Sequence, residues 1–193
     1  IMVNVGMFMR RTKPEHIQEA LWWEERCVRR QGGYDLEMCN IPVSLRFLPK
    51  GVVYKLNKTN GKATVLKSCK VLTEAESGAT SLEVSPNHLL KVGDSLAGFT
   101  ITSISYGSNK DTLTVSSLPE AIKANTVISD LKETDVVLGF GYETLDLLDR
   151  ESYQSVAPTL SVEEVYEETL PYFINEEIKA AINKYGYARF RIQ

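Results

Sequence analysis

Residues 52–67, VVYKLNKTNGKATVLK, decide the fold class of this chain. Two alternating runs flank an Asn60-Gly61 step, and both turn residues tolerate positive φ angles, so the pattern predicts a β-hairpin. Runs with strand character return five more times, at residues 81–84, 100–105, 112–116, 126–129 and 136–140. Several short strands at this spacing predict a small barrel or a sandwich of antiparallel strands.

The segment before this β-rich module has the pattern of an amphipathic helix. Apolar residues recur at helical spacing from residue 14 to residue 30. Thr12 can cap this helix and Pro14 suits its first turn. An apolar stripe needs a partner surface, and at most one of Trp22 and Trp23 can lie at its centre while the other borders it. We therefore expect this helix to form a packing edge or a subunit contact.

The segment after the module also has helical patterns. Ser161 and Glu164 have the spacing of a capping box, which predicts a helix that begins there. Asn175 begins a second predicted helix over residues 176–184. Alternation over residues 187–192 predicts a terminal strand.

The predicted fold class is therefore α+β, with a β-rich central module flanked by N-terminal and C-terminal helices. We divide the chain into an N-terminal helix with an extended arm (1–48), the central β-module (49–142), and a C-terminal helical segment with a terminal strand (143–193).

Composition limits the classes of function. The chain has 193 residues, 43% of them hydrophobic, and a formal net charge of -3, which argues against general nucleic-acid binding. No run of about 18 apolar residues occurs, so we expect a soluble protein, made in the host cytoplasm, that does not span a membrane. Three cysteines at irregular spacing fit neither a disulfide framework nor a zinc site, and we expect reduced core residues.

The motifs contain little that points to catalysis. Only two histidines exist, so a multi-histidine metal site is excluded, and we predict no catalytic, cofactor or metal site. Residues 85–94 are similar to a self-splicing Hint element, but the terminal nucleophile and the His-Asn pair of that reaction are lacking. A Hint-like or hydrolytic processing enzyme centred on His88, with Ser85 or Asp94 nearby, is the alternative from another class. A third possible function is carbohydrate binding by Trp22, Trp23 or Tyr106.

A family resemblance covers about residues 49–130, and its sharpest piece is the strand entry KVGD at residues 91–94. In order and spacing this segment resembles the β-module of head fibre and related capsid-decorating proteins of tailed phages and prophages from gut bacteria. The resemblance implies a non-enzymatic virion component that attaches to the major capsid protein or other virion proteins and is often a homotrimer. A tail or baseplate protein is the other structural role that we keep open.

Such a protein would act through protein–protein assembly as a homo-oligomer. The candidate interface residues are the large apolar side chains of the predicted flanking helices: Ile17, Leu21, Trp22, Trp23, Val28, Val165, Tyr166 and Leu170.

Overall fold

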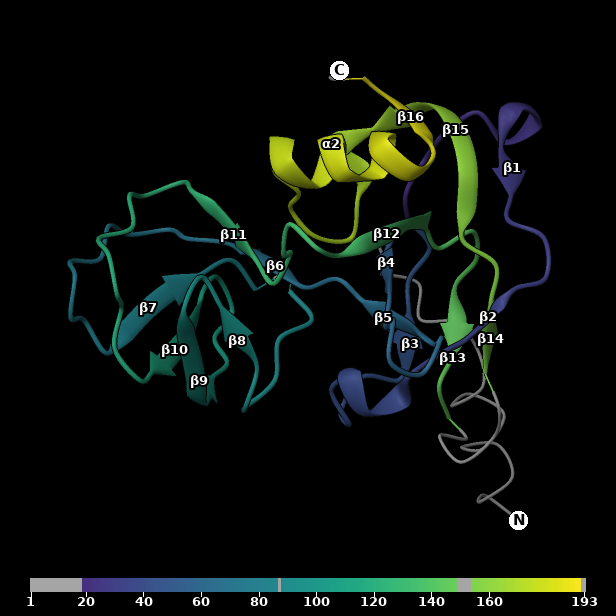
Figure 1. Cartoon of the computed structure of the whole chain (residues 1–193). Helices are drawn as coiled ribbons and strands as arrows, with labels where there is room; N and C mark the ends of the chain where they lie inside the picture. The colour runs from purple at the N-terminus through teal and green to yellow at the C-terminus, as the bar shows by residue number, and fades with distance from the viewer. Residues whose placement is uncertain (1–18, 87, 149–153, 192–193) are drawn as a thin grey trace, which may run out of the picture.

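The computed structural model describes residues 19–86, 88–148 and 154–191, which form two parts joined by a narrow ribbon (Figure 1). We call residues 68–129 the inserted lobe, because the chain leaves the larger part after residue 67 and returns to it at residue 130. The larger part, which we call the body, contains the described residues on both sides of this insertion. Strands from both ends of the chain therefore pair with one another in the body.

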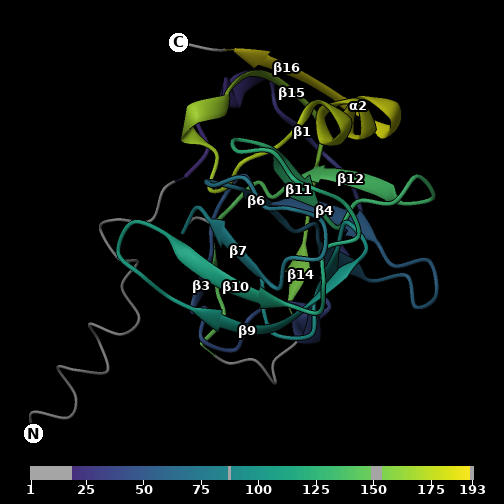
Figure 2. The same cartoon turned by 90° about the vertical axis from the view of Figure 1, so that its left-hand side faces the viewer.

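The inserted lobe is a curled, antiparallel half-barrel (Figure 2). Four strands pair in the order β7-β10-β9-β8, while β6 pairs with β11. The ribbon continues into the four-stranded sheet, because the N–H of Ser85 donates to the carbonyl of Lys70. Its strands are β6 (Ser68–Lys70), β7 (Ser81–Val84), β8 (Ser95–Leu96), β9 (Phe99–Ser105), β10 (Asp111–Val115) and β11 (Val127–Ser129).

The inserted lobe has a hydrophobic core of its own, drawn entirely from residues 69–128. Phe99, Leu82 and Leu113 are among its fully buried side chains. Burial of each such side chain stabilises the lobe by about 1.5–3 kcal/mol. Leu89 instead packs into the core of the body, so the lobe is also docked by an apolar contact.

The body consists of short sheets around two further cores. The sheet orders are β12-β4-β5 and β1-β15-β16, with the pairs β13-β3 and β14-β2 beside them. Its strands are β1 (Val28–Arg29), β2 (Tyr34–Asp35), β3 (Phe47–Leu48), β4 (Val53–Leu56), β5 (Ala63–Val65), β12 (Val136–Phe140), β13 (Leu145–Asp146), β14 (Ser155–Val156), β15 (Thr159–Tyr166) and β16 (Tyr187–Arg191). The single α-helix of the described residues, α2 (Glu176–Tyr185), covers β12 and β16 (Figure 1). The body also contains three short 3-10 turns: Glu24–Arg26, Met38–Asn40 and Glu167–Thr169.

The prediction of a β-rich chain is confirmed. The predicted hairpin is formed by β4 and β5, where Tyr54 pairs with Val65 and Gly61 has a φ of 72° in the turn. The other predicted strands are present as β7, β9, β10, β11, β12 and β16. Local alternation was sufficient for most of these strands because they bury one face in a core, whereas β12 is buried on both faces between the two cores of the body.

The predicted N-terminal helix is wrong over residues 19–30; its first residues, from residue 14, lie outside the described part. The chain is extended there, with one 3-10 turn and strand β1. The N–H of Trp23 donates to the carbonyl of Glu163, and the N–H of Tyr166 donates to the carbonyl of Leu21, both at 3.1 Å. Pairing with β15 supplies these backbone bonds, so tertiary contacts override the weak helical propensity of the segment.

The helix predicted to begin at Ser161 is also wrong, because this segment is strand β15. Glu164 has a φ of 57°, and the pairing register with β16 shifts between Val162 and Val165. This β-bulge adds a residue, so both valines face the core although they are three residues apart. The bulge therefore gives this strand the three-residue spacing of apolar residues that is typical of a helix.

The second C-terminal helix is confirmed as α2. The side chain of Asn175 accepts the N–H of Ile178 at 2.9 Å, as an N-cap should. Ile178 and Ile182 are one turn apart and both buried. Helical spacing and a cap agree with the tertiary contacts here, which is why the prediction held.

Candidate functional site

The structure separates the predicted interface residues into two groups. The buried ones belong to the core between β12, β15 and α2: Trp22, Val165 and Leu170. Tyr166 is half-buried, and Ile17 lies outside the described residues. The remaining three, Leu21, Trp23 and Val28, are exposed.

Trp22 and Trp23 point to opposite sides because the segment is extended. Trp22 packs against Phe140 and Tyr142, with ring centroids 6.1 and 6.5 Å away. Trp23 is 39% exposed, and its ring centroid lies 4.3 Å from the guanidinium carbon of Arg26. Adjacent tryptophans thus have different roles, one in the core and one at the surface.

The exposed residues gather on one side of the sheet β1-β15-β16, which we call the outer face. Val28 and Tyr187 both pair with Ser161, one from each flanking strand, so they share a row. Both are about half exposed, at 51% and 49%. Leu21 and Trp23 lie on the same side further along the segment that pairs with β15, because they alternate there with the buried Ala20 and Trp22.

Charged side chains border this apolar row. Arg26 Nη1 lies 3.3 Å from Glu163 Oε2, and Arg191 Nη2 lies 2.6 Å from Glu164 Oε1. Tryptophan, tyrosine and arginine are the residues that most often dominate binding energy at protein interfaces. The outer face therefore has the composition of a protein-binding surface.

His88 lies in a buried pair with Asp111. His88 Nε2 lies 3.1 Å from Asp111 Oδ2, and the two side chains are 2% and 3% exposed. The approach is close, but the N–H direction is poorly aligned for a hydrogen bond. His88 Nδ1 accepts the N–H of Leu90 at 3.2 Å, while Asp111 Oδ1 accepts the N–H of Gly107 at 2.9 Å.

This environment determines the protonation of the imidazole. Burial lowers the pKa of His88, against the opposing pull of Asp111. The neutral ring then carries its proton on Nε2, facing Asp111, and uses Nδ1 as an acceptor. Both ring nitrogens face protein groups, so this geometry presents no nitrogen to a substrate as a general base.

The KVGD sequence forms a turn that joins the inserted lobe to the body. Asp94 Oδ2 accepts the N–H of Lys91 at 2.8 Å and the ammonium of Lys67 at 2.5 Å. Lys67 is 1% exposed and stands directly before the lobe. Its backbone N–H donates to Asp130 Oδ1 at 2.9 Å. This bond joins the two points where the chain leaves and re-enters the body, residues 67 and 130, which we call the neck of the insertion.

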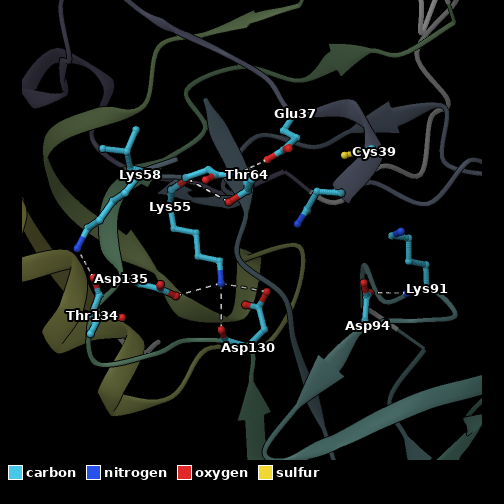
Figure 3. Close-up of a pocket in the computed structure, with 13 residues that line it drawn as sticks. Glu37, Cys39, Lys55, Lys58, Thr64, Lys91, Asp94, Asp130, Thr134 and Asp135 are labelled. Atoms are coloured by element: carbon cyan, nitrogen blue, oxygen red, sulfur yellow. Dashed lines mark hydrogen bonds and ion pairs between the residues drawn. The ribbon is translucent and has the colours of Figure 1, made fainter. Parts of the chain in front are cut away.

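Lys55 completes this polar network from strand β4 (Figure 3). Its ammonium lies 3.1 Å from both Asp130 Oδ2 and Asp135 Oδ2, and 3.0 Å from the carbonyl of Asp130. Burial lowers the pKa of Lys67 and raises that of Asp130, and the opposite charges oppose both shifts. The neck is thus held by partly buried ion pairs.

The sequence patterns identified Asp94 and Asp111 as carboxylates at strand ends or turns, but they did not predict the burial of Lys67 or the pairing of Asp111 with His88. A signal for Lys67 exists, since period-two alternation places it on the same face as the buried Ala63 and Val65. No such signal predicts the pairing of Asp111, which is far from His88 in sequence.

The cysteines and carboxylates offer no metal centre within the described residues, where no group of three ligand-type side chains could hold a metal ion. All three cysteines are free thiols. Burial raises the pKa of Cys27 to about 11 and that of Cys69 to about 12, so these two are unreactive. Cys39 is exposed, which corrects the expectation that all three are core residues.

No helix in the described part of the chain is long and apolar enough to cross a membrane. Comparisons of the chain with protein-family models, with curated proteins and with solved structures found no match.

Proposed function

We propose that this protein is a non-enzymatic structural component of a tailed-phage or prophage virion, a head fibre or capsid decoration. It assembles as a homo-oligomer through its outer face and attaches to the major capsid protein. The phage assignment is supported by the sequence resemblance of residues 49–130, and the mode of action by the outer face.

The observation that carries the proposal is the row of Leu21, Trp23, Val28 and Tyr187 on the outer face. An extended apolar row bordered by arginine is unusual on a monomer, because burial of such surface is the main source of association energy. Both signs of charge lie at its border, which allows a second copy to pair with it.

The experiment measures the molar mass by size-exclusion chromatography with light scattering. We expect an oligomer for the wild-type chain and dissociation for Trp23→Ser combined with Leu21→Ser. The matched control is Tyr106→Ser, because Tyr106 is 68% exposed but lies in the inserted lobe. A wild-type monomer that also fails to bind purified capsid protein would contradict the proposal.

The enzymatic alternative has a separate test. If the protein cleaves peptides, His88→Ala must abolish spontaneous or added-substrate cleavage while the fold is kept. Because both imidazole nitrogens face protein groups, we expect no cleavage by the wild-type chain either. Cleavage that depends on His88 would replace the structural role with a processing activity.

A further inference from the structure

A polar cleft of about 510 Å³ lies between the inserted lobe and the body (Figure 3). The body contributes most of its walls, including Lys55 and Asp135, and the lobe contributes Lys91 and Asp94. Binding sites commonly lie at such junctions, and the volume is within the usual range of about 300–1,000 Å³. The chemistry of the lining then decides which ligand fits.

The charges that line the cleft nearly cancel. Three ammonium groups, from Lys55, Lys58 and Lys91, face four carboxylates, from Glu37 and three aspartates. The buried ammonium of Lys67 stands behind Asp94 and brings the local sum to zero. A ligand with a large net charge of either sign would therefore gain little on entry.

A metal ion does not suit this cleft. The position between Asp130 and Asp135, where two carboxylates converge, is already filled by the ammonium of Lys55. An inorganic phosphate is also a poor fit, because the ammonium of Lys55 is engaged by three oxygens and that of Lys58 binds the carbonyl of Thr134. The neighbouring carboxylates would repel the anion.

An apolar or aromatic ligand is equally unsuited. The residues that line the cleft include no aromatic ring, and Leu56 is the main aliphatic side chain among them. Ligands such as nucleobases depend on stacking or apolar contact for their affinity. The ligand class that remains after these exclusions is a small, neutral molecule with many hydrogen-bonding groups.

The cleft has unused hydrogen-bonding capacity for such a ligand. The Oδ1 atom of Asn40 is buried and has no hydrogen-bond partner among the described residues. Asp94 Oδ2 accepts from Lys67 and Lys91, and Asp135 Oδ2 accepts from Lys55 and from the N–H of Lys132, so within the described residues the Oδ1 atom of each remains available. The ammonium of Lys91 has no described side-chain partner. The cleft therefore offers both a donor and acceptors to a ligand.

We propose that this cleft binds a neutral polyhydroxylated ligand, a saccharide of one or two residues. Each sugar hydroxyl both donates and accepts, so it can match a lining that contains both ammonium and carboxylate groups. The site differs from the aromatic residues Trp22, Trp23 and Tyr106, for which the sequence leaves carbohydrate binding open. It also goes beyond the assembly role and does not depend on the outer face.

Saturation-transfer NMR and isothermal titration with a panel of neutral hexoses, N-acetylhexosamines and their disaccharides test the proposal. Inorganic phosphate and calcium chloride serve as probes for the rejected ligand classes. We expect at least one neutral sugar to bind and neither ion to compete. Binding of phosphate or calcium in place of a sugar would overturn the proposal, as would failure of the whole panel to bind.

Two variants test whether the sugar binds in this cleft. Lys91→Met and Asn40→Ala should each weaken the affinity about tenfold, because each removes one hydrogen-bonding group of the lining. Lys123→Met is the matched control, since Lys123 is an exposed lysine of the same lobe that does not line the cleft. Sugar binding that these two variants leave unchanged would refute the site. Oligomer formation is measured separately, so the two proposals fail independently.

Discussion

Lys67→Met tests how the inserted lobe is held to the body. The side chain of Lys67 is 1% exposed, and its ammonium lies 2.5 Å from Asp94 Oδ2. Methionine occupies a similar volume without the charge, so the change isolates the ion pair from packing. It leaves the carboxylate of Asp94, which is 14% exposed, with the N–H of Lys91.

Removal of one partner from a buried ion pair destabilises a protein by roughly 3–5 kcal/mol. We expect about 3 kcal/mol for Lys67→Met, because partial exposure and the Lys91 N–H still stabilise Asp94. Asp94→Asn should cost about 2 kcal/mol, since the pKa of Lys67 is already lowered and the buried ammonium can release its proton. The double variant should lose about 3 kcal/mol, which gives a coupling energy of about 2 kcal/mol.

Urea unfolding of the four proteins, followed by circular dichroism, measures these free energies. The double variant should be more stable than the sum of the two single changes predicts. A loss below about 1 kcal/mol for Lys67→Met, or single effects that add within about 0.5 kcal/mol, would show that the pair does not hold the neck.

Three further predictions concern single positions in the two parts. Gly139→Ala should destabilise the body by more than about 2 kcal/mol in urea unfolding, because Gly139 has a φ of 120° and an added Cβ would lie 2.1 Å from the carbonyl oxygen of Thr159. Tyr172→Phe should cost about 1–3 kcal/mol by the same assay, since the buried hydroxyl accepts the N–H of Val53 at 2.8 Å and donates to a carbonyl at 2.9 Å. Burial lowers the pKa of His88 below its ordinary value of 6.5, so the unfolded chain binds a proton before the folded one as the pH falls. Stability should therefore decrease from about pH 7 to about pH 5.5, and His88→Gln should flatten that slope; an equal slope in both proteins would exclude the imidazole as its cause.

Local patterns were sufficient where one periodicity agreed with the tertiary contacts. The Asn60-Gly61 hairpin has its turn chemistry and its alternating strands in adjacent residues. The helix α2 has a cap and a buried stripe within a single segment. Each element is specified by neighbours in sequence, so the sequence alone could predict it.

Local patterns failed where a distant strand supplied the hydrogen bonds. The segment with Trp22 and Trp23 has apolar residues at helical spacing, but β15 binds its backbone and gives it an extended form. The bulge at Glu164 similarly places Val162 and Val165 on one face of a strand. Spacing of three residues therefore had two physical causes that sequence could not distinguish.

The sequence by itself determined that this chain is β-rich, where eight of the sixteen described strands lie, and that a C-terminal helix begins after an Asn175 cap. Only the tertiary structure decided that the lobe is an insertion, that Lys67 meets Asp94, and that exposed apolar residues form one outer face. The reason is physical: turns and periodic burial act between neighbours along the chain, whereas ion pairs, clefts and shared faces depend on residues that only the fold brings together.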